Sequence, residues 1–228
     1  MTPSLSSQIR VIRVTTTKER LRAVEVLGST YAKEKRWIGN ADTFFAPEDL
    51  ESQNVSWFLS LLGETPVGVL RILYDPPMEL YRTYGMKALD SGLDVEGFIA
   101  NNRIAEIGRF AVVPAYRSNM AVVASLMRAA SCETIERDYS HYVTDVFEGE
   151  KHSPYDFHTR VMGFKPVATH DVGELNCPNR RITMVLDLVE AYHRLKVSRP
   201  SVFRFLTRAW PKELHERLSA TSPPQPEP

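Results

Sequence analysis

Residues 103–117 read RIAEIGRFAVVPAYR, and this stretch decides the fold. The run up to Val113 is apolar and rich in β-branched residues, which predicts a strand, and Pro114 ends it. A helical pattern starts near Met120, so only a tight turn separates the strand from the helix. Free backbone N–H groups at the start of such a helix suit a phosphate or a pantetheine chain.

The composition is that of an ordinary globular protein. The chain has 228 residues, of which 43% are hydrophobic and 25% are charged, and this suits one large domain with a sizeable core. The 28 basic and 28 acidic residues give zero net charge, which argues against a general nucleic-acid-binding protein. The N-terminus has no apolar run, and no stretch approaches the roughly 20 apolar residues that span a bilayer. We therefore expect a soluble, cytoplasmic protein.

Strand and helix patterns continue on both sides of the central stretch. Strands are expected over residues 9–14, 55–62, 67–74, 103–113, 141–147, 167–171 and 182–188. Helices are expected after Thr16, within 47–53 and 78–102, over 120–138 and 153–163, and from residues 189 and 198 onward. Hairpins and helical crossovers together predict an α/β (α+β) fold with a mixed, mostly antiparallel sheet and helices on both faces.

The expected organisation is one domain with short additions. Residues 1–8 form a disordered arm, 9–188 the domain, 189–218 a helical extension packed on it, and the Ser- and Pro-rich 219–228 a disordered tail. In the first helix, the apolar spacing of Leu21, Val24, Leu27 and Tyr31 predicts the buried face.

The order of a strand, a tight turn and a long helix resembles the GNAT superfamily of acyltransferases. In that family the central strand splays from its neighbour, and the loop that follows binds the acyl donor. Residues 152–164, HSPYDFHTRVMGF, resemble the family's segment of a helix followed by Gly-Phe. The resemblance covers about residues 9–188 and implies the GNAT fold.

Two departures point to one branch of the superfamily. Ordinary GNATs bind the pyrophosphate of coenzyme A with a loop Q/R-x-x-G-x-G/A, whereas residues 117–122 read RSNMAV, and Thr159 stands where a tyrosine often protonates the leaving thiolate. Residues 106–110 (EIGRF), residues 68–73 (GVLRIL) and Trp37 are similar to the N-acyl amino acid synthases and, more distantly, to the acyl-homoserine lactone synthases. Those enzymes take long acyl chains, often from acyl carrier protein, whose pantetheine has a single phosphate.

The resemblance implies a role for each matching residue. Glu106 is the expected general base, because acyl transfer requires a neutral amine. Arg109 is the expected second catalytic residue, although it points to the opposite face of a regular strand unless a bulge intervenes. Arg71 either binds the carboxylate of the acceptor or pairs with Glu106, and a solvated hairpin face stays an equal alternative. Asp145 either orients the amine or satisfies a loop at the end of its strand.

Further residues complete the expected site. Trp37 and Phe110 are expected to contact the substrate, and the backbone near Val112 and Val113 to donate to the thioester carbonyl. The rest of the expected donor site comprises Arg117, Ser118, Asn119, Met120 and Ala121. Met120, Met127 and Phe110 either line an acyl tunnel or, as the helix stripe 120–134 favours, pack in the core.

The implied function is an N-acyltransferase that moves a long acyl group from an acyl-carrier-protein or coenzyme A thioester to the amine of an amino acid. The donor is a cosubstrate, and neither a metal nor a tightly bound cofactor is expected, because Cys132, Cys177 and the histidines lack metal-site spacing.

Basic residues in 194–212 indicate a dock for acyl carrier protein or for anionic lipid at a membrane surface, or else a solvated face. Two alternatives to the N-acyl amino acid synthase stay open. One is a coenzyme A-dependent N-acetyltransferase with a divergent loop, and the other a non-catalytic GNAT-like module that binds an acyl lipid or a partner.

Overall fold

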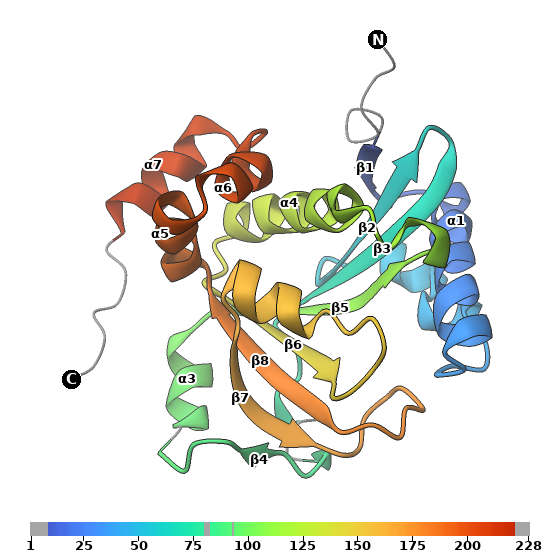
Figure 1. Ribbon diagram of the computed structural model, residues 1–228, viewed down its shortest axis with the longest axis horizontal. Coiled ribbons are helices and arrows are strands. Elements are labelled where there is room, and N and C mark those ends of the chain that lie inside the picture. Colours follow the sequence, from blue (N-terminus) through green and yellow to red (C-terminus); the bar gives the residue numbers. More distant parts are fainter. Residues whose placement is uncertain (1–8, 80–82, 93, 222–228) are drawn as a thin grey trace. The chain divides into compact units, whose positions relative to one another are not determined.

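The computed structural model describes residues 9–79, 83–92 and 94–221, and the chain divides into two compact units (Figure 1). Unit 1 comprises the described residues of Met1–Tyr74 together with Glu106–Ser131 and Glu174–Cys177. Unit 2 comprises the described residues of Asp75–Ala105, Cys132–Gly173 and Pro178–Pro228. The expected domain 9–188 therefore contributes segments to both units.

Unit 1 is built on an antiparallel hairpin. Its strands follow the order β1-β2-β3-β5, in which β2 pairs antiparallel with both β1 and β3. The elements are β1 (Ile9–Arg13), α1 (Thr17–Leu27), the π-helical η2 (Gly28–Glu34), the short 3-10 helices η3 (Asp42–Phe44), η4 (Pro47–Leu50) and η5 (Pro114–Tyr116), β2 (Val55–Leu62), β3 (Thr65–Tyr74), β5 (Ile104–Val112), which begins in unit 2, and the first turns of α4 (Met120–Glu136).

Unit 2 holds the strand order β6-β8-β7-β4, in which each neighbouring pair is antiparallel. The elements are β4 (Lys87–Ala88), α3 (Val95–Asn101), β6 (His141–Phe147), the π-helical η6 (Phe157–Met162), β7 (Lys165–His170), β8 (Arg181–Asp187), α5 (Leu188–Ser198), α6 (Pro200–Thr207) and α7 (Lys212–Ala220). The short strand β4 was not expected from the sequence.

The predicted fold class is confirmed, with α/β character and mostly antiparallel strands. In unit 1, α1 covers the face of the sheet that carries Trp57, Leu59 and Val69, and these side chains form one core with the helix. The other face meets α4 at Gly68, so helices lie on both faces of this unit. Among the described helices, none has the length and apolar character needed to cross a membrane.

The ends of the chain differ in part from the expectation. Residues 1–8 and 222–228 lie outside the described residues. The predicted tail began at Ser219, but Ser219 and Ala220 form the end of α7. This third helix of the extension was not expected separately, because the apolar pattern of α6 runs on as far as Trp210 in the sequence.

The start of α1 follows the sequence, and its buried face does so in part, since Leu27 and Tyr31 are buried as predicted. Thr16 accepts a hydrogen bond from the Glu19 N–H, and the Glu19 carboxylate accepts from the Thr16 N–H, which completes the predicted capping box. Leu21 is 55% exposed and Arg20 is buried instead. Burial of Arg20 is possible because its guanidinium pairs with Asp42 and donates to a backbone carbonyl.

Gly68 fixes how closely α4 approaches β3. A Cβ atom at this position would lie 3.0 Å from Val122 and 3.1 Å from Leu126 of the helix, and 3.3 Å from the carbonyl oxygen of Ala111. The contact with the rigid backbone of β5 leaves the strand no room to yield. A side chain here therefore requires α4 to move away from the sheet.

We expect Gly68→Val to lower the free energy of unfolding by about 1–3 kcal/mol, because the added atoms overpack the contact between β3 and α4. Denaturant unfolding followed by circular dichroism measures this loss. Gly39→Val is the matched control, since a Cβ there would meet nothing within 4 Å. An equal loss in both variants would contradict the close-approach explanation.

Candidate active site

An ion pair between neighbouring strands lies at the centre of the site. Arg71 of β3 donates from Nη2 to Oε1 of Glu106 on β5 over 2.6 Å, and both residues belong to unit 1. The side chains are only 14% and 21% exposed. Of the alternatives for Arg71, the structure shows the pair with Glu106 and excludes a solvated hairpin face.

Gly108 provides the space for this pair. A Cβ atom on Gly108 would lie 2.8 Å from Oε1 of Glu106 and 3.2 Å from Nη2 of Arg71. Glycine inside a strand often marks a place where another group approaches the backbone closely. The glycine between Glu106 and Arg109 in the sequence is therefore part of the site's construction.

Arg109 interrupts the alternation of β5. Its φ is +51°, in the left-handed region that a non-glycine residue rarely adopts. The regular strand that would point Arg109 away from Glu106 is therefore broken, as the bulge alternative required. The guanidinium pairs with the carboxylate of Glu174 and lies 4.8 Å from the centre of the Phe44 ring.

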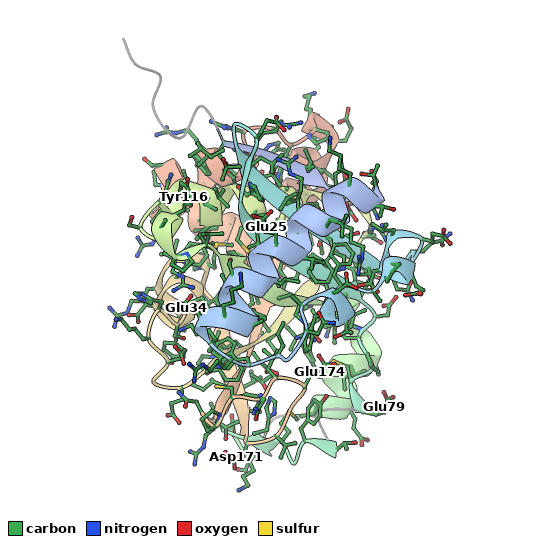
Figure 2. The ribbon with its side chains drawn as sticks, turned by 90° about the vertical axis from the view of Figure 1, so that its right-hand side faces the viewer. Glu25, Glu34, Glu79, Tyr116, Asp171 and Glu174 are labelled. Atoms are coloured by element: carbon green, nitrogen blue, oxygen red, sulfur yellow. The ribbon has the colours of Figure 1, made fainter. Side chains whose placement is uncertain are left out.

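The charges of Arg71 and Arg109 both act on the pKa values of Glu174 and Tyr31. Burial alone raises the pKa of Glu174, but the charge and hydrogen bond of Arg109, together with the charge of Arg71, outweigh it and lower the pKa. Burial raises the pKa of Tyr31, which the same two arginines partly oppose. The two guanidinium groups therefore act on one small region. Figure 2 labels Glu174 there.

Each of the two arginines has an Nε–H donor without an acceptor in the described part of the chain. The Nε atoms of Arg71 and Arg109 are buried, and within the described parts of the chain neither has a hydrogen-bond acceptor. A buried N–H without an acceptor costs about 1–3 kcal/mol. Two such donors therefore lie unsatisfied in one charged region of the described chain.

The segment with Glu174 is anchored to unit 1 although it comes late in the sequence. The Asn176 N–H donates to the carbonyl of Trp37 over 2.9 Å, and Leu175 packs against the core. The Trp37 ring packs edge-on against Tyr31 at 5.3 Å between centroids. No sequence pattern pointed to Glu174, because it lies in a polar loop 65 residues from Arg109.

Phe110 and the expected donor residues are placed as follows. The carbonyl oxygen of Phe110 accepts a hydrogen bond from the Tyr31 hydroxyl over 3.3 Å. The N–H of Val113 donates to the carbonyl of Val67, so the prediction that it donates to the thioester was wrong, because β3 and β5 remain paired at this point. Val112 keeps this role as a prediction.

Polar side chains of the loop between β5 and α4 already have hydrogen-bond partners within unit 1. Arg117 pairs with Glu34, labelled in Figure 2, and donates from Nε to the carbonyl of Val112 over 3.1 Å. The Asn119 side chain accepts from the Ala121 N–H over 3.1 Å, so this helix-start donor is engaged. Ser118 is exposed.

The stripe predicted along α4 is confirmed at Met127, Ala130 and Thr134, which are buried, but not at its first residue. Met120 is 51% exposed, whereas Val122, Leu126 and Met127 are buried. The exposed Met120 therefore does not line an enclosed tunnel, and Met127 belongs to the packed interior.

Asp145 belongs to unit 2 and has partners of its own. It accepts from the Thr183 hydroxyl over 2.8 Å and lies 3.0 Å from Nε2 of His170, whose other ring nitrogen contacts the carbonyl of Val172. Burial lowers the pKa of His170, but the hydrogen bond and charge of Asp145 outweigh it and raise the pKa. Through His170, Asp145 of β6 thus fixes the start of the loop that follows β7.

Among the described residues, no three or more His, Cys, Asp or Glu side chains form a metal-binding group.

Comparison with sequence families places the chain in one of them. A family model described as N-acyl amino acid synthase FeeM matches residues 22–186, more than half of the chain. The chain belongs to this FeeM family. The resemblance drawn from the motifs is confirmed, and the protein is an acyltransferase.

Solved structures show the same fold. FeeM, an N-acyl amino acid synthase from uncultured soil microbes, is similar with a TM-score of 0.62 and 18% identity over 81% of this chain and 93% of that chain. An aminoglycoside 6'-N-acetyltransferase complexed with coenzyme A gives a TM-score of 0.52 and 12% identity over 78% of this chain and 96% of its own. An N-acetyltransferase from Staphylococcus aureus Mu50 gives a TM-score of 0.51 and 10% identity over 79% of this chain and 98% of its own. Comparison with curated protein sequences gives no match.

We expect Glu174→Gln to lower the free energy of unfolding by about 1 kcal/mol at pH 7, a modest loss because the carboxylate is half exposed and screened. Since its pKa is lowered on folding, the pair stabilises the protein above the ordinary carboxyl pKa of 4.5, and this contribution disappears as the pH falls through the lowered value. Denaturant unfolding of both proteins at pH 7 and in acid tests this. Glu25→Gln, an exposed carboxylate of α1, is the control, and a difference that persists in acid would contradict the assignment.

Proposed function

We propose that this acyltransferase transfers a long acyl group from a thioester to the amine of an amino acid. The observation that carries the proposal is the buried group of Arg71, Glu106 and Arg109, in which two guanidinium Nε–H groups lack acceptors among the described residues. Membership of the FeeM family supports the same reaction class.

The two arginines suit the carboxylate of the acceptor. A carboxylate has two oxygens that accept charge-assisted hydrogen bonds, and arginine is the residue that binds such a group best in a partly dry site. The carboxylates of Glu106 and Glu174 balance the two guanidinium charges before the ligand arrives. A zwitterionic amino acid then enters without changing the net charge of the site.

Glu106 is the proposed base. The incoming amine must lose its extra proton before its nitrogen can attack, and a partly buried carboxylate can accept that proton directly or through water. The ion pair with Arg71 holds the carboxylate in one orientation. The nitrogen then attacks the thioester carbon, the C–N bond forms, the C–S bond breaks, and one proton passes from the nitrogen to the departing thiolate by way of solvent.

The donor side is proposed to favour a carrier-bound pantetheine. Residues 117–122 contain no glycine, and Arg117 already pairs with Glu34, which supports a donor with one phosphate rather than a pyrophosphate. Val112 is the proposed backbone donor to the thioester carbonyl. Coenzyme A thioesters remain the second donor class to be tested.

The C-terminal helices are the proposed dock for the acidic carrier protein. Tyr192 holds them together, since its ring contacts Phe203 and Trp210 and its hydroxyl lies 3.0 Å from Nδ1 of His215. Arg194 donates to the carbonyl of Val161 and so serves the fold. The basic residues left exposed are Lys196, Arg199, Arg204, Arg208 and Lys212.

A product screen by mass spectrometry tests the reaction. Purified protein is incubated with a long-chain acyl carrier protein, a long-chain acyl-CoA or acetyl-CoA, each with a pool of amino acids. We expect an N-acyl amino acid from the long-chain donors, reduced about a hundredfold or more in Glu106→Gln, because the base is lost. Glu25→Gln controls for the loss of an exposed carboxylate.

The other outcomes each contradict the proposal. Product from acetyl-CoA alone would identify a coenzyme A-dependent N-acetyltransferase. No product from folded protein with any donor would favour the non-catalytic binding module. Full activity of Glu106→Gln would remove Glu106 from the mechanism.

We expect the double variant Arg204→Glu/Arg208→Glu to raise the KM for the acyl carrier protein by about tenfold and to leave the KM for the amino acid unchanged, because the reversed charges repel an acidic partner. The difference should shrink at high ionic strength. Lys18→Glu/Lys33→Glu, at two exposed positions of α1 and η2, makes the same change in net charge and is the control. An unchanged KM for the carrier would exclude this dock.

A further inference from the structure

The two ion pairs of unit 1 differ in how firmly they hold their carboxylates. In the pair of Arg71 with Glu106, both side chains are largely buried. In the pair of Arg109 with Glu174, only the arginine is buried, and the glutamate side chain is 49% exposed. A half-exposed carboxylate leaves its partner at little cost, because water replaces the hydrogen bond that it loses. Glu174 is therefore the exchangeable carboxylate of the site.

Glu174 uses only part of the hydrogen-bonding edge that Arg109 offers. Nη2 of Arg109 donates to Oε2 of Glu174, whereas the buried Nε has no acceptor among the described residues. These two nitrogens lie on one edge of the planar guanidinium, and a carboxylate that meets this edge squarely accepts from both of them. A carboxylate that is free to choose its approach thus gains a hydrogen bond that Glu174 does not make.

The loop between β7 and β8 fixes the backbone beside Glu174 and limits how its carboxylate approaches. Leu175 packs against the core of unit 1, and the N–H of Asn176 donates to the carbonyl of Trp37 over 2.9 Å. Only the side-chain torsions of Glu174 are left to aim the carboxylate. Because the anchors lie after Glu174 in the chain and do not involve its side chain, the carboxylate can turn into solvent while they stay in place.

Arg109 has further constraints on its position that do not depend on Glu174. Its φ of +51° turns the residue out of the regular alternation of β5, and its guanidinium lies 4.8 Å from the centre of the Phe44 ring. An arginine that packs on an aromatic ring keeps the edge of its guanidinium available for a planar anion. Departure of Glu174 therefore leaves a carboxylate site that is already formed.

We infer that Glu174 determines specificity by occupying the carboxylate site of Arg109 in the free protein, and that the carboxylate of the acceptor displaces it. The choice of an amino acid as the ligand rests on the proposed function. A ligand with a carboxylate replaces one hydrogen bond to Arg109 by two, which offsets the loss of the ion pair. A ligand without a carboxylate offers no such exchange, so Glu174 keeps Arg109 engaged and the ligand is rejected.

Glu174→Gln should bind carboxylates more tightly, because glutamine has no charge with which to compete for Arg109. Isothermal titration calorimetry at constant ionic strength tests this, with sodium acetate as the probe and acetamide as its neutral counterpart. We expect the Kd for acetate to fall about fivefold, the preference that a partly exposed ion pair gives to its own partner. Acetamide should bind equally to both proteins, and Glu25→Gln, on the exposed face of α1, should leave the Kd for acetate unchanged.

The thermal stability of the same proteins gives a second readout. Without a ligand, Glu174→Gln has the lower Tm, because it lacks the ion pair. In saturating acetate, Glu174 has already left Arg109 in the wild-type protein, so the difference in Tm should disappear. A glutamate that only supports the fold would preserve the difference at every acetate concentration.

Removal of Arg109 assigns the effect to its guanidinium. In the Arg109→Gln background, adding Glu174→Gln should leave the affinity for acetate unchanged, since the donors for which Glu174 competes are gone. A fivefold gain that persists in this background would show a general effect of charge and contradict the exchange.

Acetate binding to Glu174→Gln that is no tighter than to the wild-type protein would overturn the inference and make Glu174 a residue that positions Arg109. Failure of the proposed function looks different: acetate binds with the expected pattern, but the product screen gives no N-acyl amino acid. Where the screen gives a product, Glu174→Gln should lower the KM for the amino acid about fivefold and leave kcat unchanged, because Glu174 has left Arg109 in the loaded site.

Discussion

A guanidinium group that is taken out of water needs acceptors, and unit 1 buries two of them beside each other. Arg71 and Arg109 are only 14% and 10% exposed, and each finds one carboxylate, Glu106 and Glu174 respectively. The local irregularities of β5 follow from this requirement. Gly108 leaves the room that the first pair occupies, and the positive φ of Arg109 brings the second guanidinium out of the regular alternation. Strain of this kind costs about 1–3 kcal/mol and persists only where the surroundings hold it.

Contacts from other segments of unit 1 hold this region in place. The loop that delivers Glu174 is fixed by Leu175 in the core and by the hydrogen bond from Asn176 to Trp37. Tyr31, buried next to the arginines, donates to the carbonyl of Phe110 and so fixes the strand immediately after the irregular residue. The remaining Nε–H donors are then held in fixed positions, and a ligand that uses them meets little cost of rearrangement.

The sequence predicted what local patterns encode. Strand β6 has the predicted bounds, the capping box at Thr16 is present, and the Arg71–Glu106 pair was one of the alternatives. What the sequence could not predict depends on distant residues. Arg20 is buried in place of Leu21 because Asp42 neutralises it, and Glu174 reaches Arg109 across 65 residues of chain. The positive φ of Arg109 likewise has no local sequence signature. The sequence could therefore offer a bulge in β5 only as an alternative to a regular strand.

The charged group of unit 1 and the cavity of unit 2 differ in polarity, and the polarity of a site decides how strictly it selects a ligand. The group around Arg71 is polar and charge-balanced, and two of its buried Nε–H donors have no acceptor among the described residues. Under the proposed function, it would discriminate strongly against analogues that lack a carboxylate. Unit 2 instead contains a mostly apolar cavity of about 290 Å³, and an apolar site discriminates only weakly between ligands that differ by one methylene, by about 1–3 kcal/mol. Under the proposed function, strict selection of a substrate would therefore fall to the charged group of unit 1 rather than to an apolar surface.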